Sequence, residues 1–285
     1  MIPLSPGEVQ TLVRAALSED LGAGDVTTAS TIPETTRARG HLKARQELVV
    51  AGLELAAAAF RELAPKVLLE GNLRDGDRAE RGSVLLTVEG PARALLTAER
   101  VALNCLQRLS GIATFTAAFV RQVHGTRARI LDTRKTTPGW RRLDKYAVSC
   151  GGGVNHRQRL DDLILIKDNH LAALIGALPN PIAAAVARAR QRHPYLKVEV
   201  EADRMDQVRH AVEAGADIVL LDNMTPDELR QAVAICQGRS LTEASGGIRL
   251  ENVRAIAETG VDFISIGALT HSAPWVDIGL DFEAP

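Results

Sequence analysis

Residues 197–223, KVEVEADRMDQVRHAVEAGADIVLLDN, hold the pattern that decides the fold. A short strand candidate with alternating valines, Lys197 to Glu201, precedes an amphipathic helix pattern, Met205 to Ala214. An apolar strand candidate, Ile218 to Asp222, follows. Short apolar strands separated by helices are typical of a parallel sheet, because each connection must cross back over a face of the sheet. The stretch therefore predicts a strand–helix–strand unit of an α/β fold.

The same alternation covers the chain from Arg127 onward. Other predicted strands are Ala128–Asp132, Leu163–Ile166, Leu241–Ala244 and Phe263–Ile266, and other predicted helices are Ile182–Gln191, Pro226–Cys236 and Leu250–Thr259. About six units are visible, fewer than the eight of a complete barrel. The pattern predicts a closed or nearly closed barrel of parallel strands, with a doubly wound open sheet as the alternative.

The chain before this region has a mixed texture. Ser5-Pro6-Gly7-Glu8 forms a capping box that opens an amphipathic helix, and short strands and helices with turn residues between them follow. A long helical pattern begins at Ala92, is interrupted at Ser110-Gly111 and resumes at Ile112. We place a domain boundary in this helical stretch, which divides the chain into an N-terminal α/β domain over 1–110 and a barrel domain over 111–271.

Composition excludes several classes of function. The 285 residues include 34 Lys and Arg against 35 Asp and Glu, so the chain lacks the basic balance of a non-specific nucleic-acid or anionic-membrane binder. Aromatic residues make up only 3%, too few for a platform that stacks nucleic-acid bases. The most apolar window, Leu48 to Phe60, is short and contains Glu54, so we predict no membrane span.

The cysteines and the N-terminus predict the compartment. Cys105, Cys150 and Cys236 are odd in number and far apart, which favours reduced thiols over a disulfide framework or a zinc site. The first residues show no signal-peptide pattern. We therefore expect a cytoplasmic protein.

Polar residues or glycines follow every predicted strand. In a parallel α/β fold these carboxyl ends meet at one edge of the sheet, where reactive groups lie. One charged residue at a strand end is usually solvated, but four charged endings in series favour a functional site. In chain order the endings are Asp132-Thr133-Arg134-Lys135, Lys167-Asp168-Asn169-His170, Glu201, Asp222-Asn223, Ser245-Gly246-Gly247 and Gly267-Ala268-Leu269.

Two features point to an anionic ligand. Ser245-Gly246-Gly247 before a predicted helix has the form of a phosphate cradle, whereas the chain has no P-loop and no dinucleotide-binding glycine pattern. Between Arg127 and His170, ten basic residues stand against five acidic ones, and a glycine run precedes His156-Arg157. Converging cations repel one another unless a ligand balances them, so we expect a small ligand with several negative charges.

Glu201 and Asp222 are carboxylates at consecutive strand ends. Two hard oxygen ligands beside a phosphate site suit Mg²⁺, held directly or through water. The alternative is a plain ion pair with a neighbouring Lys or Arg. Glu199 shares strand parity with Glu201 and is the weaker candidate.

The motifs together identify a family. The chain closely resembles the quinolinate phosphoribosyltransferases over nearly its whole length. The resemblance is carried by Ile130-Leu131-Asp132-Thr133-Arg134-Lys135-Thr136, Gly151-Gly152-Gly153-Val154-Asn155-His156-Arg157, Ile166-Lys167-Asp168-Asn169-His170, Leu220-Leu221-Asp222-Asn223 and Ala244-Ser245-Gly246-Gly247-Ile248.

The resemblance implies a fold and a reaction. The fold is an N-terminal α/β sandwich, to which the C-terminal tail 272–285 returns, packed on an incomplete, open barrel of parallel strands. The reaction transfers phosphoribosyl from 5-phosphoribosyl-1-pyrophosphate to the ring nitrogen of quinolinate with Mg²⁺. Loss of CO₂ then gives nicotinate mononucleotide for NAD biosynthesis.

The resemblance also implies roles for single residues. Arg134, His156, Arg157 and Lys167 would bind quinolinate, and Arg100 would reach the site from the partner in a homodimer. Lys135 would contact the phosphoribosyl pyrophosphate, Glu201 and Asp222 would lie at the ribose and the metal, and Ser245, Gly246, Gly247 and Gly267 would hold the 5-phosphate. Lys135, Lys167, Glu201 and Asp222 are the predicted catalytic set.

Other functions remain open at this point. A barrel aldolase or lyase would use Lys167 but would leave the wider basic cluster unexplained. A phosphoribosyltransferase for another carboxylated ring and an inert phosphate-binding protein would both use the same residues.

Overall fold

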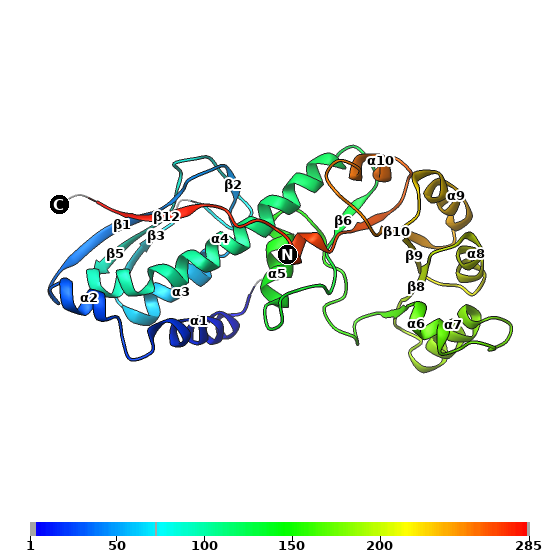
Figure 1. The fold of residues 1–285 in the computed structure, drawn as a ribbon, viewed down its shortest axis with the longest axis horizontal. Helices are drawn as coiled ribbons and strands as arrows, with labels where there is room; N and C mark the ends of the chain where they lie inside the picture. The colour runs from blue at the N-terminus through cyan, green and yellow to red at the C-terminus, as the bar shows by residue number, and fades with distance from the viewer. Residues whose placement is uncertain (1–3, 72, 284–285) are drawn as a thin grey trace. The chain divides into compact units, whose positions relative to one another are not determined.

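The computed structural model describes residues 4–71 and 73–283; the first three residues of the predicted N-terminal domain, Asn72 and the last two residues of the predicted tail lie outside them. Figure 1 shows the fold. The chain forms two compact units, each built from separate stretches. The first unit comprises Met1–Ala117, Thr137–Gly152 and Leu269–Pro285, and the second Ala118–Thr136 and Gly153–Ala268.

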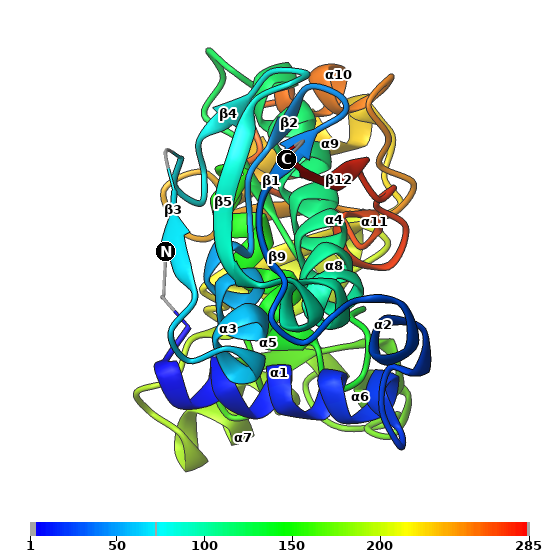
Figure 2. The same cartoon turned by 90° about the vertical axis from the view of Figure 1, so that its left-hand side faces the viewer.

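The first unit is a four-stranded antiparallel sheet with helices packed on it. The strand order is β12-β1-β5-β3. Figure 2 shows β3, β5 and β1 together with the helices α1, α3 and α4. The strands are β1 (Arg37–Ala44), β3 (Leu68–Glu70), β5 (Val84–Pro91) and β12 (Ile278–Phe282), with a separate pair β2 (Leu48–Val49) and β4 (Arg78–Ala79). The helices are α1 (Pro6–Leu21), α2 (Val26–Thr31), α3 (Leu53–Leu63), α4 (Ala92–Gln122) and α5 (Arg141–Cys150).

Local signals explain where helix α1 begins. The Ser5 side chain accepts a hydrogen bond from the Glu8 backbone N–H, and the Glu8 carboxylate accepts one from the Ser5 N–H. This reciprocal capping box satisfies two of the amide donors that a helix start leaves free. The predicted start of the N-terminal helix is confirmed.

The predicted interruption at Ser110-Gly111 is wrong, because α4 runs unbroken from Ala92 to Gln122. The glycine serves packing. A Cβ atom at Gly111 would lie 2.2 Å from the Pro274 carbonyl oxygen. Only glycine therefore lets the segment before β12 pass so close to the helix. The Ser110 hydroxyl bonds the backbone of Ala51 instead of breaking the helix.

The second unit is an open barrel of six parallel strands. The strand order is β6-β11-β10-β9-β8-β7. Strands β7 to β11 therefore lie side by side in chain order, β6 pairs with β11, and β6 and β7 are the two open edges. This order excludes a doubly wound sheet, in which the strand order reverses near the middle. The barrel strands are β6 (Arg129–Leu131), β7 (Ile164–Ile166), β8 (Val198–Ala202), β9 (Ile218–Asp222), β10 (Leu241–Ser245) and β11 (Phe263–Ser265).

Helices lie on the outer side of these strands (Figure 1). They are α6 (Asp168–Ala172), α7 (Pro181–Arg192), α8 (Met205–Glu213), α9 (Pro226–Cys236) and α10 (Val253–Ala257). The short helix α11 (Ala268–His271) follows β11 and falls almost wholly in the first unit. Helix α10 begins at Val253, later than the predicted Leu250, because the Asn252 side chain closes a turn with Arg249 and Gly247. None of the described helices is long and apolar enough to span a membrane.

Candidate functional site

The carboxyl ends of the barrel strands bring the predicted site residues to one edge. Asp222 on β9 lies in register with Ser245 on β10, and Glu201 on β8 lies in register with Leu220, two residues before Asp222. Lys167 directly follows β7, whose Ile166 is in register with Val200. Because parallel strands all point the same way, these side chains share one rim of the sheet.

Lys167 and Glu201 form an ion pair across that rim. The Lys167 Nζ lies 3.2 Å from Glu201 Oε2, and the side chains are 48% and 18% exposed. Helix α6 begins directly after Lys167, whose backbone N–H donates to His170 Nδ1. The pair therefore places one cation and one carboxylate within reach of the same ligand.

The next two strand ends are linked to each other. The Asn223 N–H donates to the Ser245 carbonyl oxygen at 2.9 Å, and Asn223 Nδ2 donates to Asp222 Oδ2 at 2.7 Å. Gly246 has φ of 91°, and a Cβ atom there would lie 2.3 Å from Asn223 Oδ1. Glycine is thus required twice at this position, for the left-handed backbone and for the space that Asn223 occupies.

Two half-buried arginines, Arg134 and Arg157, bring positive charge to the loops after β6 and before β7. Burial and the nearby charge of Arg134 lower the pKa of Arg157, whose Nη1 donates to the Leu163 carbonyl oxygen at 2.9 Å. The Nε atoms of both arginines are buried and have no hydrogen-bond partner among the described residues. Buried polar nitrogens are almost always bonded, so this pair fits an anionic ligand.

A buried carboxylate positions the segment that carries Arg157. Asp132 is fully buried at the end of β6 and accepts hydrogen bonds from Asn155 Nδ2 at 2.7 Å and from the His156 N–H at 2.8 Å. Val154 also forms a parallel bridge with Leu131. The segment therefore lies along β6, at one of the two open edges of the barrel.

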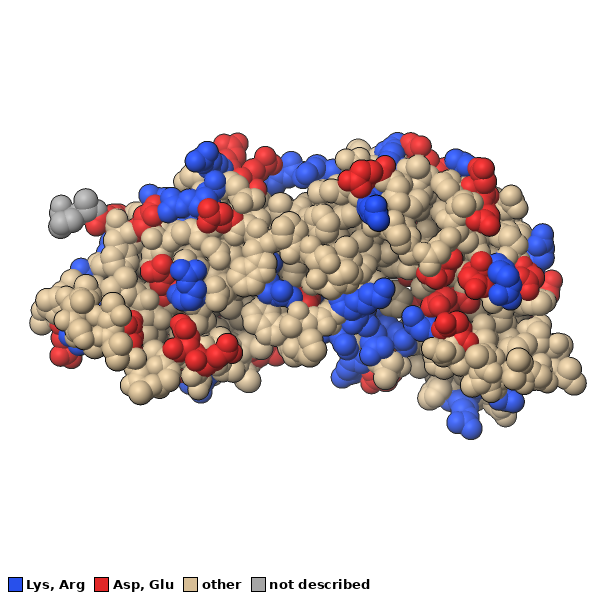
Figure 3. Space-filling view, in the orientation of Figure 1, with Lys and Arg blue, Asp and Glu red and all other residues tan. Residues whose placement is uncertain are grey.

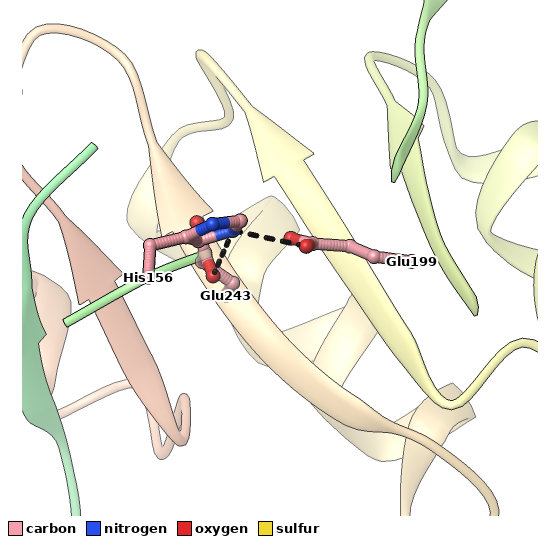
Figure 4. A group of neighbouring side chains, drawn as sticks. All are labelled: His156, Glu199 and Glu243. Atoms are coloured by element: carbon pink, nitrogen blue, oxygen red, sulfur yellow. Dashed lines mark hydrogen bonds and ion pairs between the residues drawn. The ribbon is translucent and has the colours of Figure 1, made fainter. Parts of the chain in front are cut away.

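The His156 ring points from this segment toward two glutamates on barrel strands (Figure 4). Its Nε2 lies 3.0 Å from Glu199 Oε2 on β8 and 3.7 Å from Glu243 Oε2 on β10. Its Nδ1 accepts a hydrogen bond from the Arg157 N–H at 2.8 Å. Because Nδ1 accepts, the ring is neutral and Nε2 carries the proton that is donated to Glu199.

Burial raises the pKa of both glutamates. The pKa of Glu199 rises to about 7 and that of Glu243 to about 8, where the charge of Glu199 adds to the effect. Two buried carboxyl groups in contact share a proton, because both cannot be charged at low cost.

Sequence reasoning missed Glu243 and set Glu199 below Glu201. A usable signal was present, since an acidic residue inside an apolar strand is costly unless a partner is near. The partners come from segments far apart in the chain, which one-dimensional patterns do not reveal.

Three further predicted site residues, Lys135, Gly267 and Arg100, lie in two connecting loops and on helix α4. Lys135 is exposed in the loop after β6, where its N–H donates to Thr133 Oγ1 at 3.0 Å. Gly267 lies between β11 and α11. Arg100 is exposed on α4 in the first unit.

Charge is unevenly distributed over the visible face. In Figure 3 many basic and acidic side chains are interspersed, but Lys and Arg gather in one patch near the middle of the view, with acidic side chains beside it. The anion-binding character is therefore local, as the near-zero net charge of -1 predicts.

Comparison with known families matches almost the entire chain. A family model described as "Quinolinate phosphoribosyl transferase, N-terminal domain" matches residues 25–110. A second, "Quinolinate phosphoribosyl transferase, C-terminal domain", matches residues 112–281.

Individual relatives are similar over the same length. A probable carboxylating nicotinate-nucleotide pyrophosphorylase of Bacillus subtilis is 42% identical over 275 residues, covering 96% of this chain and 93% of the relative. The carboxylating nicotinate-nucleotide pyrophosphorylase of Mycobacterium leprae is 45% identical over 277 residues, covering 94% and 95%. The crystal structure of NadC from Streptococcus pyogenes has a TM-score of 0.93 at 39% identity and covers 100% of both chains.

Proposed function

The chain belongs to the quinolinate phosphoribosyltransferase family, and from this premise we infer that it is a decarboxylating pentosyltransferase of NAD biosynthesis. It transfers phosphoribosyl from 5-phosphoribosyl-1-pyrophosphate to the nitrogen of quinolinate. The products are nicotinate mononucleotide, pyrophosphate and CO₂. The observation that carries the assignment is the pair of matches that follow one another along residues 25–110 and 112–281.

We assign quinolinate to the cationic side of the site. Arg134 and Arg157 offer buried guanidinium nitrogens, and Lys167 offers an ammonium at the neighbouring strand end. A dicarboxylate balances such a set of charges, and planar guanidinium groups suit the geometry of carboxylates. His156 belongs to the same group, with both ring nitrogens engaged by Arg157 and Glu199.

We assign phosphoribosyl pyrophosphate to the ends of β8, β9 and β10. Ser245, Gly246, Gly247 and Gly267 hold the 5-phosphate, and Lys135 contacts the pyrophosphate. Displacement at the anomeric carbon develops positive charge on the ribose, which the carboxylates of Glu201 and Asp222 stabilise. Lys135, Lys167, Glu201 and Asp222 are thus the proposed catalytic residues.

The same carboxylates fit a magnesium ion. Glu201 bonds Lys167 through one oxygen and Asp222 bonds Asn223 through one oxygen, which leaves a second hard oxygen on each. When bound, Mg²⁺ neutralises charge on the departing pyrophosphate. The ion is a proposal supported by this donor set.

The second step needs a stabilised carbanion at the ring carbon that loses CO₂. The ring nitrogen becomes a pyridinium in the first step and stabilises that carbanion, which takes up a proton from water to give the product. No covalent bond to the protein is needed. Lys167 serves in binding, since its ammonium is paired with Glu201. Borohydride trapping of a covalent Lys167 adduct would contradict this role and favour the aldolase alternative.

We also propose a cytoplasmic homodimer in which Arg100 of one chain completes the site of the other. The exposed position of Arg100 on α4 supports a role outside its own unit. The three widely spaced cysteines support the location.

The purified protein is incubated with quinolinate, phosphoribosyl pyrophosphate and Mg²⁺, and release of CO₂ is followed together with nicotinate mononucleotide. Stoichiometric formation of both is expected. Absence of product at every Mg²⁺ concentration contradicts the proposed function. Replacing quinolinate with other carboxylated rings tests the close alternative.

A further inference from the structure

The buried pair Glu199 and Glu243 has no place in the mechanism above. Glu199 is fully buried and Glu243 is 1% exposed, so neither presents a surface to substrate. Each keeps one carboxyl oxygen, Oε1, without a hydrogen-bond partner among the described residues, while the other oxygen faces His156. Two buried acids impose a cost on the fold that a purely structural strand would avoid with apolar residues.

The pair is connected to the quinolinate side by hydrogen bonds. Glu243 Oε2 lies 3.7 Å from His156 Nε2, and Glu199 Oε2 accepts the proton of that nitrogen at 3.0 Å. His156 Nδ1 then accepts the backbone N–H of Arg157. The ring therefore needs one tautomer and one orientation to donate to Glu199 through Nε2 and to accept from Arg157 through Nδ1.

The charges of Glu199 and Arg134 also act on Arg157. The charge of Glu199 favours the charged guanidinium of Arg157, which burial and Arg134 oppose. Glu199 therefore bears on both the direction and the charge of Arg157.

We propose that Glu243 is a positioning residue that orients Arg157 for a substrate carboxylate through Glu199 and the His156 ring. The inference rests on the proposed function, because it assigns Arg157 to quinolinate. Glu243 itself stays apart from the reacting atoms.

Two substitutions separate positioning from simple packing. E243A removes the carboxyl group that lies 3.7 Å from His156 Nε2. The Michaelis constant for quinolinate is therefore expected to rise about tenfold, the usual scale for losing one buried polar partner. The constant for phosphoribosyl pyrophosphate changes less than about twofold, because its site lies on other strand ends. E243Q keeps a polar side chain of the same shape, so it is expected to restore the parent values within about twofold.

A matched control lies one residue away on the same strand. Thr242 is buried, and its hydroxyl bonds Asp262 instead of the glutamates. T242V therefore lowers stability without a selective effect on quinolinate. Equal rises in both Michaelis constants for E243A, or an E243Q variant as impaired as E243A, would overturn the proposal. If E243A does not fold, E243D, which withdraws the carboxyl by one methylene, takes its place.

A substrate-free measurement keeps this proposal separate from the proposed function. In protein labelled with ¹⁵N-histidine, long-range correlation spectra identify His156 as the signal absent from H156N. The parent and E243Q are expected to show a protonated Nε2 and an unprotonated Nδ1, and E243A or E243D a mixture of tautomers. A protonated Nδ1 in the parent overturns the proposal whether or not the enzyme turns over quinolinate, whereas absent turnover with the expected spectra counts against the proposed function alone.

Discussion

Arg134 is half-buried in the loop after β6, and the chain balances its charge poorly. Its buried Nε has no hydrogen-bond partner among the described residues, and Arg157 is close enough for the two charges to repel. We predict that R134A raises the Michaelis constant for quinolinate at least about tenfold, since a charge-assisted bond contributes about 1.5–3 kcal/mol. The Michaelis constant for phosphoribosyl pyrophosphate is expected to stay nearly unchanged.

A control for R134A lies in the next basic segment. Arg159 is exposed and paired with Asp161, so R159A is expected to leave both Michaelis constants near the parent values. Steady-state kinetics with each substrate varied in turn measures the difference. Equal effects of R134A on both substrates would contradict the assignment.

Gly246 offers a second test at residue scale. Its backbone is left-handed, and a methyl group would displace the Asn223 side chain that bonds Asp222. We predict that G246A weakens binding of phosphoribosyl pyrophosphate about tenfold or more, because it adds a clash of the overpacking type, about 1–3 kcal/mol, beside the ribose carboxylates.

Gly238 supplies the matched control, with φ of 73° and nothing within 4 Å of an added Cβ. G238A therefore carries similar backbone strain, about 1–2 kcal/mol, without the clash. Isothermal titration with phosphoribosyl pyrophosphate compares the two variants. Similar losses of affinity in both would show that backbone strain alone is responsible.

The buried acids make stability depend on pH. The pKa of Glu199 is raised to about 7 and that of Glu243 to about 8, whereas the pKa of a glutamate in the unfolded chain is about 4.3. Between these values the folded protein holds protons that the unfolded chain has lost, so the free energy of unfolding falls as pH rises. E243Q removes one of the two titrating groups, so its free energy of unfolding should fall less than that of the parent between pH 5.5 and pH 8.5. We predict that the difference in stability between E243Q and the parent shifts in favour of E243Q over this range. Urea unfolding at both pH values checks the sign.

At the scale of elements, helix α4 shows how packing can reverse a local propensity. Gly111 in a helix interior is normally worse than alanine by about 1 kcal/mol, yet the Pro274 carbonyl oxygen lies where a Cβ would be. We predict that G111A lowers the free energy of unfolding by about 1–3 kcal/mol. Gly7 in α1 has no atom within 4 Å of an added Cβ, so G7A should be neutral or stabilising. Urea unfolding of both variants measures this, and a stabilised G111A would contradict the packing argument.

The same element marks the limit of prediction from sequence. The barrel strands are visible as apolar runs such as Ile218–Asp222, because burial on both faces leaves a local signature. The reason for Gly111 depends on a residue far along the chain, so no local pattern shows it. The carboxyl ends with Lys167, Glu201 and Asp222 could be predicted from topology, whereas the Glu199–Glu243 pair needed the strand order.

At the scale of the whole molecule, the proposed sharing of sites between subunits can be tested by mixing. R100A chains and K167A chains are each expected to be nearly inactive. If Arg100 acts in the partner's site, random reassortment leaves one site intact in each mixed dimer, which restores about one quarter of the parent activity. Activity after unfolding and refolding an equal mixture measures this. Absence of recovery would place Arg100 in its own chain's site, and a fully active R100A would place it outside any site.

Strand β12 has a consequence for how the protein is made. It pairs with β1 from Gly40↔Phe282 to Ala44↔Ile278, so one edge of the first sheet is supplied by residues synthesised long after its neighbour. All six barrel strands leave the ribosome before β12 does. Translation therefore offers the barrel its complete set of strands first, and the unit that begins the chain is the last to be completed. Until then β1 presents an unpaired edge to the cell, the kind of surface on which chaperones act and aggregates begin.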